Sequence, residues 1–414
     1  MEKTFHITTF GCQMNEHDSE IIAGMLENMG YRRTAERRDA SVAIINTCSV
    51  RENADKRFFG TLGQLKRRKE QDPDFFVCVC GCMMQQQRII DRIKSKYPWV
   101  DLIFGTNNIA RFPVLLSKVV SEHEKEIEIW DGHREIVEGL PSERLHKTKA
   151  LVNITYGCNN FCTYCIVPYT RGREVSRKPE DILSEIKRLR DDGVREVMLL
   201  GQNVNSYRGE NCSFSELIRR TAEIEGIERI RFMTSHPKDL SDELIETFRD
   251  EPKLCKYIHL PVQAGSDAVL KKMNRHYNIE RYLDIVERLR EVCPEITIST
   301  DIIVGFPGET EEDFEKTLDV VRTVRYDSAF TFLYSPRQGT PAAEWENQIP
   351  EEVKHERFNR LVKLVDDISA EKNALYEGKT ERILIEGESK RNETALAGRT
   401  DGFKLVNVSL KEED

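Results

Sequence analysis

The sequence has no apolar run that approaches the roughly 20 residues of a membrane-spanning helix. An apolar signal region is also missing, because the N-terminus runs from Met1 through His6 straight into a polar, glycine-containing segment. Positive charge is not in excess, since the formal net charge is −9 at pH 7. We therefore expect a cytoplasmic protein without a membrane partner, and a local basic patch would have to hold any RNA.

Disulfides are not expected either, because the cytoplasm keeps thiols reduced. The eleven cysteines need another explanation, and clustered cysteines in such a compartment more often bind metal or take part in catalysis. With 414 residues, 39% of them hydrophobic and 32% charged, the chain is long enough for roughly two to four packed domains.

The first hundred residues contain three short apolar runs, each followed by a cysteine. The runs are residues 5–10, 42–47 and 75–80, and helix-patterned stretches at 18–30 and 51–71 lie between them. Apolar strands that alternate with helices are typical of α/β proteins. We therefore predict a doubly wound parallel sheet in this part of the chain.

Cys12, Cys48 and Cys82 each lie directly past the end of one of these strands. Ligand groups in such a sheet gather beyond the carboxyl ends of the strands, so the three thiols are expected to converge. Three thiolates suit a [4Fe–4S] cluster with one open iron or, less well, a zinc ion. For Cys78 and Cys80, which alternate within the strand, simple burial is the favoured interpretation.

A second cysteine trio follows a predicted strand at residues 150–156. Cys158, Cys162 and Cys165 form a C-x3-C-x2-C motif, with Tyr164 before the last cysteine. A short loop of this kind folds three thiolates around one [4Fe–4S] cluster and leaves one iron for S-adenosylmethionine. The cofactor would carry the chemistry, and the protein would supply ligands and a dry pocket. Zinc is the alternative, but it would need a fourth ligand near by.

The region after this motif predicts a partial (βα)6 barrel. Further strand-like runs occur at residues 196–200, 227–233, 257–260, 296–304 and 329–333, with helix-patterned segments such as 179–192 and 279–292 between them. Barrel enzymes place their active sites at the carboxyl ends of the strands. Polar residues cluster at these ends, and we expect them to bind S-adenosylmethionine: Gln202, Asn203, Ser235, Gln263, Asp301 and Tyr334.

Two further features near these strand ends are weaker signals. His236, before a proline, is more often a structural cap than a site residue. The glycine-containing turn at residues 305–310 can let backbone approach an adenine, although such turns are common. Arg171, Arg173, Arg177 and Lys178 are either contacts for RNA phosphates or a solvated helix start.

These motifs together resemble the tRNA methylthiotransferases of the radical S-adenosylmethionine superfamily. The matching segments are residues 9–20, 45–51, 80–83, 156–168, 171–174 and 259–266. Gln13-Met14-Asn15 after the first Gly-Cys favours the branch that acts on isopentenyladenosine. Related branches that modify threonylcarbamoyl-adenosine or a ribosomal-protein side chain read differently there, and both stay as alternatives.

The resemblance implies a role for each cysteine trio. Cys158, Cys162 and Cys165 would hold the radical-generating [4Fe–4S] cluster, and the N-terminal trio an auxiliary [4Fe–4S] cluster that delivers sulfur. One S-adenosylmethionine would methylate that sulfur, and a second would give the 5′-deoxyadenosyl radical that removes hydrogen from C2 of the adenine. The implied partners are the tRNA anticodon stem-loop, whose base must leave its stack, a reductant such as flavodoxin or ferredoxin, and a sulfur donor.

The chain is expected to divide into three domains, at residues 1–135, 145–375 and 376–414. In the last, residues 382–386 and 403–408 read as strands of a small all-β RNA-binding domain of the TRAM type, which looks one hairpin short. Two interpretations from other classes remain. One is a zinc-structured RNA-binding protein without catalysis, and the other is an electron carrier, which would not need a barrel.

Overall fold

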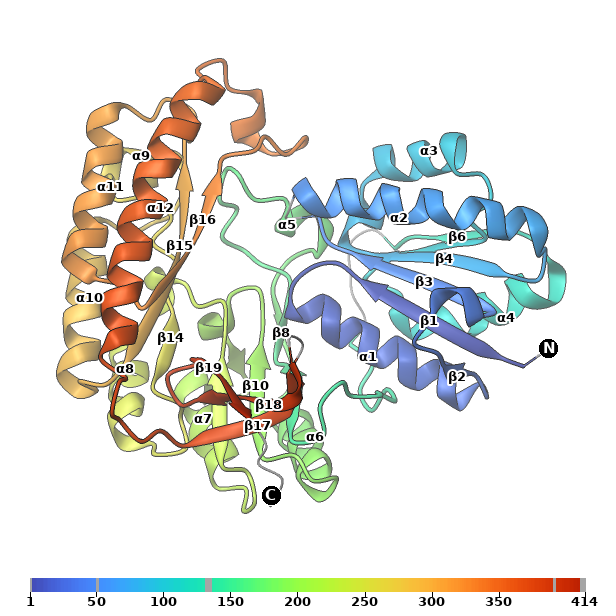
Figure 1. Cartoon of the computed structure of the whole chain (residues 1–414), viewed down its shortest axis with the longest axis horizontal. Helices are drawn as coiled ribbons and strands as arrows, with labels where there is room; N and C mark the ends of the chain where they lie inside the picture. The colour runs from blue at the N-terminus through green and yellow to red at the C-terminus, as the bar shows by residue number, and fades with distance from the viewer. Residues whose placement is uncertain (1, 50–51, 131–135, 390–391, 410–414) are drawn as a thin grey trace. The chain divides into compact units, whose positions relative to one another are not determined.

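The computed structural model describes residues 2–49, 52–130, 136–389 and 392–409. The chain divides into two compact units, coloured from blue to red along the chain in Figure 1. The N-terminal unit comprises residues 1–145, 156–159 and 166–175, and the C-terminal unit comprises residues 146–155, 160–165 and 176–414. No helix in the described ranges is long and apolar enough to cross a bilayer. The finer division into three domains stays a prediction.

The N-terminal unit is built on a six-stranded sheet in the order β2-β1-β3-β4-β5-β6. Its strands are β1 (Thr4–Thr9), β2 (Arg32–Arg33), β3 (Val42–Thr47), β4 (Phe76–Gly81), β5 (Leu102–Phe104) and β6 (Glu126–Glu128). Every neighbouring pair is parallel. The order reverses beside β1, because β2 pairs on one side of it and β3 on the other. The predicted parallel α/β sheet is confirmed.

Two helices cover each face of this sheet, as Figure 1 shows. The helices α1 (Gln13–Asn28) and α4 (Phe112–Glu122) pack on one apolar cluster. The helices α2 (Glu52–Gln71) and α3 (Gln87–Lys96) pack on another. The sheet is therefore doubly wound, as predicted. Ile22 and Leu26, four residues apart on α1, are fully buried, which is the spacing that places two side chains on one helical face.

The C-terminal unit contains six parallel strands in chain order. They are β7 (Lys149–Asn153), β10 (Glu196–Leu200), β13 (Arg229–Phe232), β14 (Tyr257–His259), β15 (Thr297–Val304) and β16 (Ser328–Leu333). The first three form one ladder and the last three another. A parallel bridge between Ile230 and Leu254 joins β13 to the residues just before β14. This arrangement confirms the predicted partial barrel.

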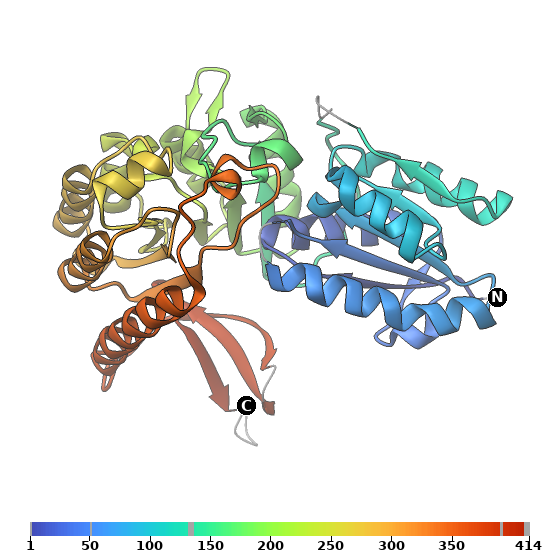
Figure 2. The same cartoon turned by 90° about the horizontal axis from the view of Figure 1, so that it is seen from above.

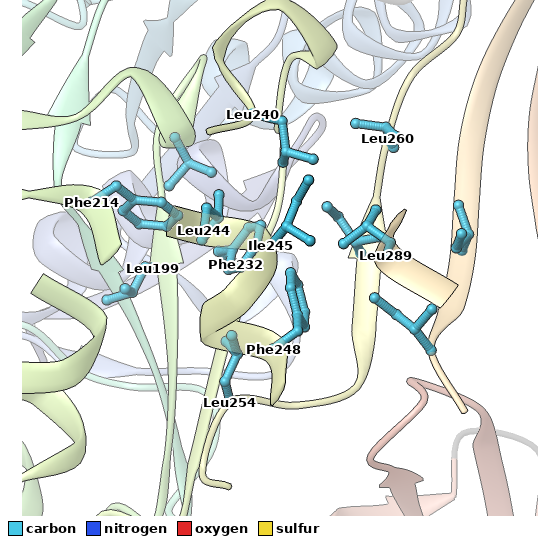
Figure 3. Close-up of a cluster of buried hydrophobic side chains, with 14 of the residues drawn as sticks. Leu199, Phe214, Phe232, Leu240, Leu244, Ile245, Phe248, Leu254, Leu260 and Leu289 are labelled. Atoms are coloured by element: carbon cyan, nitrogen blue, oxygen red, sulfur yellow. The ribbon is translucent and has the colours of Figure 1, made fainter. Parts of the chain in front are cut away.

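Helices follow the strands and bury the outer face of the barrel. They are α6 (Pro179–Asp191), α7 (Phe214–Ala222), α8 (Asp242–Asp250), α9 (Asp267–Lys272), α10 (Ile279–Val292), α11 (Glu311–Val324) and α12 (Glu351–Ala374). Figure 3 shows part of the resulting core, in which Phe232 meets Phe214 edge to face with ring centroids 5.1 Å apart. Burying each such side chain contributes about 1.5–3 kcal/mol.

Side chains alternate along β15, so the inner face of the barrel differs from the outer one. Ile298 and Ile302 pack into the core beneath the helices. Ser299 and Asp301, which lie between them in sequence, contact His259 on the opposite face. The barrel interior is therefore partly polar, as a binding site requires.

The last described residues form an antiparallel three-stranded sheet of β17 (Ile383–Ser389), β18 (Asn392–Thr400) and β19 (Leu405–Ser409), drawn in red in Figure 2. The sequence analysis predicted the outer two strands but not β18. The turn after β18 contacts the start of the barrel: Arg231 donates to the carbonyl oxygens of Thr400 and Asp401, and Phe403 stacks on Tyr257. This contact covers the amino ends of the barrel strands, which we call the floor of the barrel.

Short elements complete the description. They are α5 (Val167–Thr170), β8 (Thr155–Tyr156), β9 (Val175–Ser176), β11 (Arg208–Gly209), β12 (Cys212–Ser213) and the 3₁₀ turns η1 (Arg37–Asp39), η2 (Cys82–Gln85), η3 (Ile109–Arg111), η4 (Val204–Ser206), η5 (Pro237–Asp239) and η6 (Pro341–Glu344).

Candidate active site

The N-terminal cysteines lie at one edge of the parallel sheet. Cys12 precedes the first residue of α1, just past β1, while Cys48 follows β3 and Cys82 follows β4. The strand order reverses between β1 and β3, and ligands of open α/β sheets bind at such a point. Cys12 is exposed, and the other two cysteines are buried.

A glycine makes this close approach possible. Gly81, directly before Cys82, has a φ of 101°, a conformation that side-chain-bearing residues rarely adopt. A Cβ atom on Gly81 would lie 2.2 Å from the carbonyl oxygen of Thr47. The Gly-Cys pair at the end of β4 therefore brings Cys82 close to the backbone that precedes Cys48.

Electrostatics couple the three thiols. A hydrogen bond with Cys48 lowers the pKa of Cys12 to about 6, and the charge of Arg171 and the backbone amides at the start of α1 act in the same direction. Burial raises the pKa of Cys82, while Arg171 opposes that rise. The trio thus contains one thiol that is readily ionised and a buried cation placed to stabilise negative sulfur.

Arg171 is not available to RNA. Its side chain is 2% exposed, its Nε lies 2.9 Å from Cys82 Sγ, and its Nη2 lies 3.1 Å from Asp18 Oδ2. Arg177 is also buried, donates to the Asn153 carbonyl oxygen at 2.6 Å and pairs with Glu185 at 2.7 Å. The interpretation of these two arginines as phosphate contacts is wrong, because both have internal partners.

The residues of the N-terminal trio fit a cluster with three protein ligands. Three cysteines, one of low pKa and one bonded to a guanidinium, form the donor set that a [4Fe–4S] cluster uses. In the described part of the chain, no three His, Cys, Asp or Glu side chains are placed to ligate one metal ion. In a cubane [4Fe–4S] cluster each thiolate binds a different iron, so the three cysteines need not be close enough to ligate one ion.

The second trio lies in the loop after β7. Cys158 belongs to the N-terminal unit, where its amide donates to the Gly172 carbonyl oxygen at 3.1 Å. Cys162 and Cys165 belong to the C-terminal unit, where the Cys165 amide donates to the Cys162 carbonyl oxygen at 2.9 Å. A single loop thus carries all three thiols, and its donor set also fits a [4Fe–4S] cluster.

The segment after α9 supports the part of this loop that belongs to the C-terminal unit. Thr163 bonds to the carbonyl oxygens of Lys272 and Met273. The Asn274 side chain donates to the carbonyl oxygens of Asn160 and Phe161, both at 3.1 Å. Arg275 donates to Cys162 Sγ at 3.6 Å from a buried position. This segment therefore fixes the loop conformation, and the sequence analysis did not identify it.

Five of the six predicted polar residues follow the carboxyl ends of barrel strands, whereas Asp301 lies within β15, and several of the six have hydrogen-bond partners. Asn203 donates to Asp239 at 2.6 Å, and the Ser235 hydroxyl donates to the His259 carbonyl oxygen. The backbone N–H of Gln263 donates to the backbone carbonyl oxygen of Asp301 at 2.8 Å, and Gln263 has a φ of 67°. Gln202, which follows β10, is half-buried.

Several buried polar atoms at these strand ends have no hydrogen-bond partner in the structure. They are both side-chain polar atoms of Asn153, Thr155 Oγ1, Asn203 Oδ1, His236 Nε2 and the Tyr334 hydroxyl. Leaving such groups unpaired is costly, so a bound molecule is expected to satisfy them. Burial also raises the pKa of Tyr334 to about 12, which keeps its hydroxyl a donor. Asn153 and Thr155 were missed as site residues, although their position just before the C-x3-C-x2-C loop was a usable signal.

Aromatic surface is exposed inside the incomplete barrel. Phe330 and Phe332 on β16 are 49% and 36% exposed. In the register of the sheet, Phe330 lies opposite Asp301, and its ring meets the His259 ring with centroids 5.8 Å apart. Large apolar side chains exposed beside polar ones are typical of a binding surface.

Comparison with known proteins connects these sites to a family. Residues 152–321 match the Radical SAM superfamily, and residues 4–105 match the uncharacterized protein family UPF0004. The chain is 57% identical, over 98% of its length and 86% of the relative, to a tRNA-2-methylthio-N(6)-dimethylallyladenosine synthase of Clostridioides difficile. It is 56% identical to the synthase of the same name from Clostridium beijerinckii, over 100% of this chain and 91% of the relative. The chain belongs to the tRNA-2-methylthio-N(6)-dimethylallyladenosine synthase family.

More distant solved structures share the fold of this family member. The radical S-adenosylmethionine methyltransferase TsrM of Kitasatospora setae, solved with cobalamin and a [4Fe-4S] cluster bound, has a TM-score of 0.60 at 13% identity, over 83% of this chain and 77% of that chain. The cobalamin-dependent S-adenosylmethionine radical enzyme OxsB has a TM-score of 0.54 at 12% identity, over 100% of this chain and 65% of that chain. These similarities support the α/β architecture described above.

Proposed function

We propose that this protein converts N6-isopentenyl(dimethylallyl)adenosine next to the tRNA anticodon to its 2-methylthio derivative. The observation that carries the proposal is the 57% identity to a synthase of that name across 98% of the chain, which spans both units. Two cysteine trios, one in the first hundred residues and one in the C-x3-C-x2-C loop, would supply the donor sets that such chemistry needs.

Cys158, Cys162 and Cys165 would hold one [4Fe–4S] cluster, and Cys12, Cys48 and Cys82 a second. When bound, these groups supply one-electron cleavage of S-adenosylmethionine and a methylated sulfur for transfer to C2 of the adenine. The protein's own contribution is to hold the ligands, to exclude water and to orient both molecules. Arg171 on Cys82 and Arg275 on Cys162 orient one thiol of each trio.

The barrel mouth would bind S-adenosylmethionine through Gln202, Asn203, Ser235, Gln263, Asp301 and Tyr334. The unpaired atoms of Asn203 and Tyr334 support this assignment, and those of Asn153 and Thr155 add to it. An amino-acid and ribose moiety carries enough donors and acceptors to satisfy such groups.

Phe330 and Phe332 would cover the target base. Base stacking on an aromatic side chain is worth about 1–3 kcal/mol. Burying the isopentenyl group adds about 0.8 kcal/mol per CH₂. An unmodified adenosine would lose the apolar contribution.

The remaining partners follow from this chemistry. The anticodon stem-loop of tRNA is the substrate, a flavodoxin or ferredoxin would supply electrons, and a separate donor would replace the transferred sulfur. We place the protein in the cytoplasm, where tRNA is modified. We assign these roles to three domains. They are a methylthiotransferase domain at 1–135, a radical S-adenosylmethionine domain at 145–375 and a TRAM-like domain at 376–414.

The test uses reconstituted full-length protein under anaerobic conditions with dithionite and S-adenosylmethionine. Three anticodon stem-loops are compared, carrying isopentenyladenosine, unmodified adenosine or threonylcarbamoyl-adenosine, at low ionic strength because RNA binding is salt-dependent. Nucleoside mass spectrometry should show the methylthio product mainly on the first. Equal turnover of the first two, or product on the third alone, would overturn the substrate assignment. A colourless protein that binds zinc and cleaves no S-adenosylmethionine would overturn the enzyme assignment.

A further inference from the structure

A buried ion pair stands behind one cysteine of the N-terminal trio. Arg171 and Asp18 are 2% and 1% exposed and lie 153 residues apart in sequence. The Arg171 Nε donates to Cys82 Sγ at 2.9 Å, while its Nη2 pairs with Asp18 Oδ2 at 3.1 Å. Taking two charges out of water carries a large desolvation cost, so a buried ion pair adds little net stability.

A second arginine contacts the other trio in a different electrostatic setting. Arg275, also buried, donates from Nη1 to Cys162 Sγ at 3.6 Å. Its other hydrogen bonds go to neutral groups, the Tyr277 hydroxyl at 3.2 Å and the Pro261 carbonyl oxygen at 3.1 Å. One trio therefore has a guanidinium with a carboxylate beside it, and the other has a guanidinium hydrogen-bonded to neutral oxygens.

We propose that Arg171 is a positioning residue that sets the reduction potential of the auxiliary cluster through Cys82, and that Asp18 limits this effect by balancing its charge. The inference rests on the proposed function, because it requires the N-terminal trio to hold a cluster. Hydrogen bonds to the cluster sulfurs and the local net charge are two of the factors that set the potential of an iron–sulfur cluster. A nearby positive charge stabilises the reduced, more negative form.

The two members of the pair should therefore act in opposite directions. Replacing Arg171 by Met removes a charge and an N–H···S bond, so the potential should become more negative. Asp18→Asn keeps the shape and one acceptor oxygen but leaves the guanidinium charge unbalanced, so the potential should become more positive. Arg171→Lys keeps the charge without the planar fork of donors and should give a smaller negative shift.

The experiment measures the auxiliary cluster alone, in the full chain with Cys158, Cys162 and Cys165 replaced by Ala. Redox titration followed by electron paramagnetic resonance gives the midpoint potential with Arg171→Met, Arg171→Lys and Asp18→Asn added in turn. We expect about a tenfold change in the reduction equilibrium for Arg171→Met, which corresponds to about 59 mV for one electron. Arg275→Met in the same background is the matched control and should leave the midpoint potential of the auxiliary cluster unchanged.

Opposite shifts of the midpoint potential for the Arg171 and Asp18 variants support the proposal, since a loss of structure would not shift the potential in opposite directions. Shifts in the same direction, unchanged potentials, or an equal shift with Arg275→Met would overturn it. If Arg171→Met does not fold, the Asp18→Asn and Arg171→Lys variants decide the matter by the signs of their shifts. Absence of any cluster in the unsubstituted background would instead overturn the proposed function, and this inference with it.

Discussion

The Arg231 guanidinium lies 3.0 Å from the Glu196 carboxylate, Nε to Oε2, and both side chains are 1% exposed. Arg231 also donates to the Thr400 and Asp401 carbonyl oxygens in the turn after β18. This arginine therefore joins two strands of the barrel floor to the C-terminal sheet.

Replacing Arg231 by Met should destabilise the protein by about 3 kcal/mol, because the buried Glu196 carboxylate would lose its partner at 3.0 Å and keep only Arg229, at 4.0 Å. Urea unfolding measures the change. The matched control is Arg219→Met, since Arg219 is 38% exposed beside Glu243 and a surface pair of this kind is worth about 0–1 kcal/mol. Equal changes in unfolding free energy for the two substitutions would contradict the larger contribution expected of the buried Arg231–Glu196 pair.

Replacing Cys158, Cys162 and Cys165 by Ala should halve the iron content and abolish S-adenosylmethionine cleavage. These thiols are proposed to hold the cluster that supplies the electron. Iron analysis and chromatography of 5′-deoxyadenosine provide the measurements. Iron content that stays at the wild-type level would contradict the cluster assignment.

Substituting Cys12, Cys48 and Cys82 by Ala should have a different result. The production of 5′-deoxyadenosine should remain measurable, whereas the methylthio product should disappear, because only sulfur delivery is lost. Cys78→Ala is the matched control, since that buried cysteine lies inside β4 rather than beyond its end. Full methylthio product from the triple variant would make the auxiliary cluster dispensable.

Phe330→Ala should reduce kcat/KM for the isopentenylated stem-loop by about fivefold or more, because an aromatic stacking contact is worth about 1–3 kcal/mol and the variant also loses apolar surface that would cover the isopentenyl group. The reduction for the unmodified stem-loop should be smaller, so discrimination between the two substrates should narrow. Competition assays on both stem-loops measure this ratio. Val114→Ala, an exposed apolar position on α4, should change neither value. A uniform loss on both substrates would speak against a specificity role.

Glu309 should make stability depend on pH. Burial raises its pKa to about 7, although the Gly305 amide and Arg357 oppose the shift. Between about pH 4.5 and 7 the folded state holds this proton while the unfolded chain has lost it, so stability falls as pH rises. Relative to Glu309→Gln, the wild type should lose about 3 kcal/mol over that range, at 1.36 kcal/mol per pKa unit. Urea midpoints at several pH values test this, and parallel curves for the two proteins would contradict it.

The elements that the sequence predicted best are those with strong local signals. The predicted bounds of β10 and α10 agree with the structure, and α10 begins after Asn278, whose side chain caps the Arg281 amide. The strand β18 was missed because its Asn, Ala and Gly residues have low strand propensity. It is a strand because β17 and β19 pair with it from both sides.

The candidate site shows the same limit. The six cysteines were identifiable because their spacing and their position after strands are local features. The true setting of Arg171 was not, because its partners Cys82 and Asp18 lie 89 and 153 residues away. Charged residues in a polar stretch suggest solvent, and only the folded chain shows which of them become buried.

The floor of the barrel has a consequence for the order of events. The turn at residues 400–403 and the arginines beneath it occupy the amino ends of the strands, so reactants are expected to enter and leave at the carboxyl ends. A large RNA bound at the carboxyl ends of the strands would cover a smaller molecule bound there before it. S-adenosylmethionine should therefore bind before tRNA, and its spent fragments should depart only after the RNA has gone.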